Sequence, residues 1–132
     1  MSKRPPSITE AEWLILEVLW DRSPAPAEHV VARLSKRTDW HPRTVKTLLH
    51  RLVRKDAVSF TRDGKRYLYS ARLGREQCVR EATRCFLGRI FGGKAGAAIL
   101  HMVEEERLSP DEIASLRRLL DGRVSRRKPE GK

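Results

Sequence analysis

The chain has 132 residues, a length that accommodates one or two small domains and does not favour a large catalytic architecture. Its 28 Lys and Arg against 17 Asp and Glu give a formal net charge of +11, which favours a polyanionic partner such as nucleic acid or an anionic lipid surface. Because no run of about 18 apolar residues and no signal peptide is recognisable, we expect no membrane insertion and a cytoplasmic protein.

Two short helices are predicted near the start of the chain, behind a flexible N-terminus of residues 1–7. Thr9 and Glu12 have the spacing of a capping box, and an apolar stripe with helical periodicity follows as far as Trp20. The segment 21–26, rich in Ser and Pro, ends this helix. A second helix is expected over Pro26–Lys36.

The third predicted helix, Arg43–Lys55 behind Pro42, is the most specific feature of the sequence. Its apolar residues recur at helical spacing on one face, and no Asp or Glu occurs from 42 to 55. An acid-free basic face suits close approach to DNA phosphates, and Arg, Lys and Thr side chains can contact base edges. The alternative interpretation is a solvated basic face. The candidate DNA-binding residues of this helix are Arg43, Thr44, Lys46, Thr47 and Arg51.

A β-hairpin is predicted after the third helix. Val58–Thr61 and Tyr67–Ser70 alternate with a period of two and flank an Asp-Gly turn signal. Tyr67 and Tyr69 share one face of this hairpin, which could indicate stacking on bases, but the spacing favours packing of at least one of them beneath the hairpin. The basic residues at the tip, which can reach the DNA backbone or the minor groove, are Arg62, Lys65 and Arg66.

Three short helices followed by a hairpin have the order of a winged helix-turn-helix. The remaining sequence predicts helices over Arg75–Phe91, Lys94–Glu106 and Pro110–Gly122, with a break at the glycines between the first two. We therefore predict a mainly α fold with three parts: a winged-helix domain at residues 8–71, a helical dimerisation region at 72–122 and a disordered basic tail at 123–132. The apolar residues expected to form the dimer interface are Phe86, Leu87, Ile90, Phe91, Ile99, Leu100, Val103, Ile113, Leu116, Leu119 and Leu120.

No catalytic, metal-binding or cofactor-binding motif is recognisable. The four histidines are far apart and lack ligand spacing, and the glycines near Lys94 do not form a phosphate-binding loop. Cys78 and Cys85 lie seven residues apart in a predicted helix, about 10 Å, which is too far for a disulfide. We expect buried or half-buried thiols on one helix face, with a redox or metal role as the alternative.

Three stretches of the sequence resemble the penicillinase-repressor family, the BlaI/MecI group of winged-helix transcriptional repressors. Thr9–Trp20 resembles the family's opening helix, Arg43–Lys55 its recognition helix and Gly64–Tyr69 its wing. Segments between Phe86 and Ile113 resemble its dimerisation region more loosely. Asp56 stands where the family usually has a glycine after the recognition helix.

The resemblance implies a homodimer that binds a two-fold-related DNA operator and represses β-lactam-resistance or related genes, without enzymatic activity. In that family a membrane-bound sensor metalloprotease detects β-lactam, and the repressor is then cut in its dimerisation region by the sensor or a downstream protease. His101 and Met102 occupy the place of the family's scissile Asn-Phe pair. Copper-responsive relatives carry Cys-x-Cys pairs that are absent here, so a copper response is not expected.

Three alternatives stay open at the level of sequence. The basic domain could be an adaptor that binds RNA or an acidic protein, or the chain could be a small hydrolase with an unrecognised site. His101 and Met102 could also be ordinary residues of a dimer core, in a repressor that answers to another signal.

Overall fold

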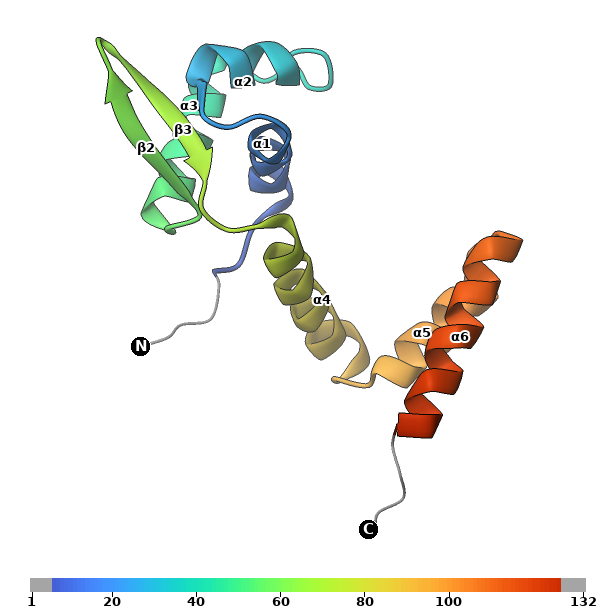
Figure 1. Cartoon of the computed structure of the whole chain (residues 1–132). Helices are drawn as coiled ribbons and strands as arrows, with labels where there is room; N and C mark the ends of the chain where they lie inside the picture. The colour runs from blue at the N-terminus through green and yellow to red at the C-terminus, as the bar shows by residue number, and fades with distance from the viewer. Residues whose placement is uncertain (1–5, 127–132) are drawn as a thin grey trace. The chain divides into compact units, whose positions relative to one another are not determined.

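The structure is a computed structural model that describes residues 6–126 (Figure 1). Within this range the chain forms six α-helices and one three-stranded antiparallel sheet, so the predicted mainly α fold is confirmed. The chain divides after Phe86 into two compact units, which are described in turn. The predicted flexible N-terminus and basic tail fall largely on residues 1–5 and 127–132, outside the described range.

Three helices open the N-terminal unit. Helix α1 spans Glu10–Asp21 and begins with the predicted capping box, in which the Thr9 hydroxyl accepts the Glu12 N–H at 3.1 Å and the Glu12 carboxylate accepts the Thr9 N–H at 2.9 Å. Helix α2 spans Ala27–Leu34 and is two residues shorter at its C-terminus than predicted. Helix α3 spans Pro42–Arg54, with Pro42 in the first turn as expected.

The sheet contains the predicted hairpin and one strand that was not predicted. Strand β2, Val58–Asp63, pairs with β3, Arg66–Ala71, so each strand of the hairpin is longer than its alternating pattern suggested. Strand β1, Ala25–Pro26, adds to the other edge of β3 and gives the order β1-β3-β2. Two residues are too few to show alternation, so the sequence carried no signal for β1.

The core of this unit lies between α1, α2, α3 and the sheet. Its largest fully buried side chains include Ile15, Leu16, Leu19, Leu34, Leu49 and Leu52. The segment after the hairpin also packs here, because the Trp20 indole N–H donates to the Leu73 carbonyl at 2.9 Å and Cys78 is buried in the core. The compact unit therefore runs to Phe86, beyond the predicted domain end at residue 71.

Helix α4, Arg75–Phe91, has the predicted bounds and contributes residues to both units. Both of its cysteines are free thiols, as expected, but only Cys78 is buried. Cys85 is exposed, so the expectation of a buried or half-buried thiol was wrong for that residue. Burial raises the pKa of the Cys78 thiol, which makes it a poor nucleophile.

The C-terminal unit contains α5, Ala95–Glu105, and α6, Pro110–Arg126. Gly92 and Gly93 adopt positive φ angles of 59° and 83° between α4 and α5, which explains the predicted break there. Helix α6 continues past Gly122, where the sequence was expected to leave the helix, as far as Arg126. A single glycine weakens a helix by only about 1 kcal/mol relative to alanine, which is too little to end it.

Candidate nucleic-acid interface

The exposed face of α3 carries the basic residues predicted from sequence. Val45, Leu48, Leu49 and Leu52 of this helix are buried in the core, as expected. The opposite face exposes Arg43, Thr44, Lys46 and Thr47 to solvent. Within residues 6–126, neither Arg43 nor Lys46 forms an ion pair, so both charges are available to a ligand.

Two local hydrogen bonds shape the first turns of α3. His41 caps the helix, because its Nδ1 accepts the Arg43 N–H at 3.0 Å. The Thr47 hydroxyl donates to the Arg43 carbonyl at 3.0 Å, which leaves its methyl group and an oxygen lone pair for an outside partner. The capping role of His41 was not predicted, although its position directly before Pro42 was a signal for it.

Arg51 differs from the other α3 candidates, because its exposed side chain lies close to the buried Glu12 carboxylate. Its Nη1 is 3.8 Å from a carboxylate oxygen of Glu12, and the Lys55 Nζ is 2.6 Å from the other oxygen. Glu12 is fully buried. Burial raises the pKa of Glu12, but the hydrogen bond and charge of Lys55 and the hydrogen bonds with Thr9 outweigh it, and the resulting pKa is lowered.

Glu12 was predicted only as part of the capping box. The signal for its second role was an acid inside the apolar stripe of α1, since a buried carboxylate needs a cationic partner elsewhere in the fold.

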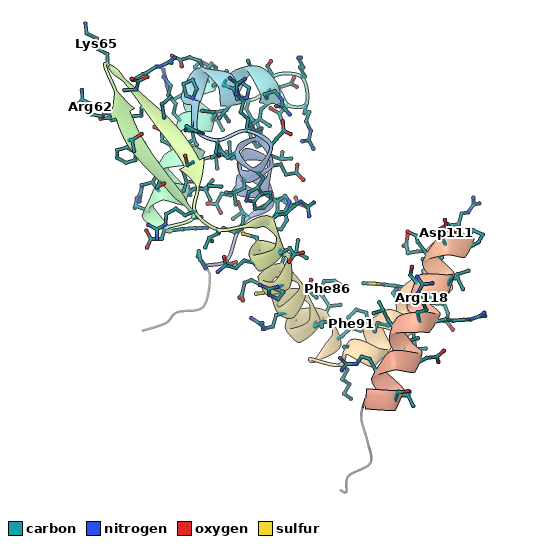
Figure 2. All side chains as sticks on the ribbon, in the orientation of Figure 1. Arg62, Lys65, Phe86, Phe91, Asp111 and Arg118 are labelled. Atoms are coloured by element: carbon teal, nitrogen blue, oxygen red, sulfur yellow. The ribbon has the colours of Figure 1, made fainter. Side chains whose placement is uncertain are left out.

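The tip of the hairpin exposes the three predicted wing cations, two of which are labelled in Figure 2. Lys65 lies in the turn and forms no ion pair within the described residues. Arg66 lies 4.0 Å from Asp63, and the Arg62 guanidinium is 5.7 Å from the centre of the Tyr67 ring. All three charges are therefore accessible to solvent and to a polyanion.

The tyrosines of the hairpin behave differently from each other. Tyr69 is buried in the core, which confirms that at least one of the pair packs beneath the hairpin, and burial raises the pKa of its hydroxyl. Tyr67 is 43% exposed and meets the Phe60 ring edge-on at 5.0 Å.

A cleft of about 320 Å³ lies between α3, the hairpin and the start of α2. The two predicted sources of basic residues meet here, because Lys46 and His50 of α3 line the same space as Lys65 and Arg66 of the hairpin. Glu28 of α2 is the acidic residue in its lining. The recognition helix and the hairpin tip therefore present cations toward a shared space.

The C-terminal unit exposes most of its large apolar side chains. None of the predicted dimerisation residues is buried, and Leu100 and Leu119 are 69% and 66% exposed. Of the hydrophobic residues described after Phe86, only Ala98 is buried. His101 and Met102 are exposed on α5, and the His101 ring lies 6.1 Å from that of Phe91, which Figure 2 labels.

Residues 6–126 contain neither a cluster of metal ligands nor a membrane-spanning helix. No group of three or more His, Cys, Asp or Glu side chains in this range is arranged to hold a metal ion. None of the helices described is long and apolar enough to cross a membrane.

A basic, acid-free third helix beside a hairpin with a basic tip defines a winged-helix DNA-binding protein. The sequence profile of the penicillinase repressor family matches residues 8–122, and the chain belongs to this family. The predicted family is thus confirmed, and the chain is a DNA-binding transcriptional repressor rather than an enzyme.

Similar proteins agree with this assignment along nearly the whole chain. The penicillinase repressor of Bacillus licheniformis is 29% identical over 126 residues, which cover 96% of this chain and 98% of that protein. The methicillin resistance regulatory protein MecI of Staphylococcus aureus is 28% identical over 121 residues, 92% of this chain and 98% of its own.

Two solved structures resemble the N-terminal part. The solution structure of the DNA-binding domain of the repressor BlaI is 31% identical with a TM-score of 0.51 and covers 58% of this chain and 93% of that one. The monomeric form of Bacillus licheniformis BlaI in complex with the blaP half-operator is 30% identical, with a TM-score of 0.50 and the same coverage.

Proposed function

We propose that the chain represses transcription as a homodimer that occupies a two-fold-related DNA operator in the cytoplasm and excludes the transcription machinery sterically. The observation that carries this proposal is the convergence of cations from α3 and the hairpin on one cleft. The similarity to BlaI, whose structure includes a half-operator, supports duplex DNA as the partner over RNA or an acidic protein.

In this proposal the side chains divide into two groups. Arg43, Thr44, Lys46 and Thr47 open α3 and would face base edges in the major groove, because a recognition helix contacts bases with its N-terminal residues. The hairpin cations and Arg51 would contact phosphates, which position the protein without reading sequence. The candidate phosphate contacts are Arg51, Arg62, Lys65 and Arg66.

The C-terminal unit would supply the dimer interface. Exposed apolar residues recur along α5 and α6 at helical spacing, and exposed apolar surface of this kind is typical of a protein interface. A dimer would bind two half-sites at once, so its affinity for a full operator would exceed that of one N-terminal unit by orders of magnitude.

Induction by proteolysis would act on the same unit. We propose the bond between His101 and Met102 as the cleavage site of a sensor protease or a downstream protease, because both residues are exposed on α5. The helix must open locally before a protease can bind this segment in extended form. Cleavage would separate α6 from the DNA-binding half and so weaken the dimer.

A mobility-shift assay with duplex DNA from upstream of the protein's own gene tests the central proposal. We expect sequence-selective retardation by the full-length chain, with protection of two symmetric half-sites. Equal retardation of operator and scrambled duplexes would contradict an operator-specific repressor. Selective binding to RNA or to an acidic protein would favour the adaptor.

A further inference from the structure

The cleft between α3 and the hairpin contains one acid among its cations. Lys46 and His50 line it from successive turns of α3, and Lys65 and Arg66 line it from the end of the hairpin. Glu28 also lines it, from the first turn of α2. A carboxylate is unexpected in a proposed DNA-binding surface, because its negative charge repels the DNA phosphates.

The Glu28 carboxylate forms no ion pair among the described residues. Within residues 6–126 no Lys, Arg or His side chain lies within 4.0 Å of it. Two acids of α1 differ in this respect, since Glu12 is paired with Lys55 at 2.6 Å and Glu17 with Arg37 at 3.2 Å. The charge of Glu28 therefore acts on whatever enters the cleft.

We propose that one DNA phosphate occupies this cleft and that Glu28 repels it, so that Glu28 limits the affinity of the protein for any duplex. The proposal rests on the proposed operator binding. In a helix-turn-helix the helix before the recognition helix crosses the DNA backbone, so a residue at the start of α2 faces phosphates and not base edges. The cleft offers a phosphate three cationic side chains and the ring N–H of His50.

Repulsion by Glu28 would lower the affinity for all DNA more than it would change the selectivity for the operator. Phosphates are present in every duplex, so the repulsion weakens operator and unrelated DNA by a similar factor. A net charge of +11 would otherwise favour tight binding throughout the chromosome. Glu28 thereby shortens the time that the repressor spends on unrelated sites.

The test compares Glu28→Gln with Glu10→Gln, which removes the same charge from an exposed residue of α1 outside the cleft. Fluorescence anisotropy of full-length protein should show that Glu28→Gln binds operator and scrambled duplex about fivefold more tightly than wild type. Glu10→Gln should change both affinities by less than about twofold. A series of operators, each with one phosphate replaced by a neutral methylphosphonate, locates the phosphate in the cleft. When that phosphate is replaced, Glu28→Gln should no longer increase the affinity.

Two outcomes would overturn the proposal, and a third would contradict the operator binding on which it rests. A selective loss of operator affinity in Glu28→Gln would show that the carboxylate accepts a hydrogen bond from a base. Equal effects of Glu28→Gln and Glu10→Gln would show that position in the cleft is irrelevant. Wild-type protein that binds no duplex selectively would instead contradict the proposed operator binding itself.

Discussion

The Lys55 Nζ lies 2.6 Å from Oε1 of Glu12, so an ion pair joins the end of the recognition helix to the first turn of α1. Glu12→Gln keeps the capping-box hydrogen bond, because glutamine also serves at that position, but removes the charge. We expect it to lower the free energy of unfolding by about 2 kcal/mol, measured by urea denaturation. Glu17→Gln, which breaks only the exposed pair with Arg37, should cost less than about 1 kcal/mol.

The same pair predicts a pH dependence. The folded-state pKa of Glu12 lies below its ordinary value of 4.5, so the stabilisation is present above that pH and is lost as the pH falls through the folded-state pKa. The difference in stability between wild type and Glu12→Gln should therefore shrink below about pH 4.5. A difference that grows on acidification would mean that burial, not Lys55, controls this carboxylate.

Thr47 should contribute to DNA binding through its methyl group, because its hydroxyl already donates to the Arg43 carbonyl. Thr47→Ser keeps the hydroxyl and removes the methyl, so it should weaken operator binding about as much as Thr47→Ala, roughly threefold to tenfold. Thr44→Ala should also weaken operator binding, since Thr44 is exposed on the same turn. Unchanged affinity in all three variants, with unchanged thermal unfolding, would remove this face of α3 from a reading role.

Lys65 should act through a phosphate. Lys65→Ala is expected to weaken operator and random duplex similarly and to lower the slope of log affinity against log salt by about 1. Anisotropy titrations at four or more salt concentrations give this slope. A loss confined to one operator base position, with the slope unchanged, would indicate base reading by the hairpin.

Dimerisation should depend on the exposed apolar residues of α5 and α6. Leu100→Lys and Leu119→Lys place a charge where side chains are 69% and 66% exposed in the protomer, so they should leave its fold intact while disrupting a dimer. Sedimentation velocity should show monomers for both. Gln77→Lys, an equal charge change at an exposed position of α4, is the matched control and should remain dimeric. Dimers in all three variants would place the interface elsewhere.

Cleavage between His101 and Met102 can be checked by mass spectrometry of the repressor from induced cells. We expect an N-terminal fragment that ends at His101, together with release of the operator. Intact chain during full derepression would show that induction follows another route. Met102→Pro should block cutting at this bond, although it also breaks α5, so circular dichroism must accompany it.

Features of the fold that depend on local sequence were predictable, and those that depend on distant pairing were not. The capping box of α1 and the Asp-Gly turn involve residues a few positions apart, and both were recognised. Strand β1 exists because Ala25 pairs with Tyr69, far along the chain, and the pairs of Glu12 and the position of Glu28 likewise require the folded arrangement. The candidate side chains could thus be named from the sequence, but the cleft that Lys46, Lys65 and Arg66 line together could not.

Asp56, between α3 and the hairpin, has an unusual backbone conformation. The residue has a φ of 65°, in the left-handed region that favours glycine, at the position where the family resemblance led us to expect a glycine. The turn between α3 and the hairpin therefore keeps the conformation that a glycine would adopt, and the departure in sequence does not alter the order of the elements that follow.

The Trp20 indole donates a hydrogen bond to the Leu73 carbonyl, which fixes the ring against the segment after the hairpin. The absorption of this ring can therefore report whether the segment is attached. The Trp20 ring also meets that of Trp13 edge-on at 5.4 Å, so the two rings form an asymmetric, coupled chromophore at the junction between α1 and the segment after the hairpin. Near-ultraviolet circular dichroism reports such fixed aromatic packing, whereas the far-ultraviolet signal reports helix content. Detachment of this segment would thus be visible as a spectral change at constant helicity, without any label attached to the chain.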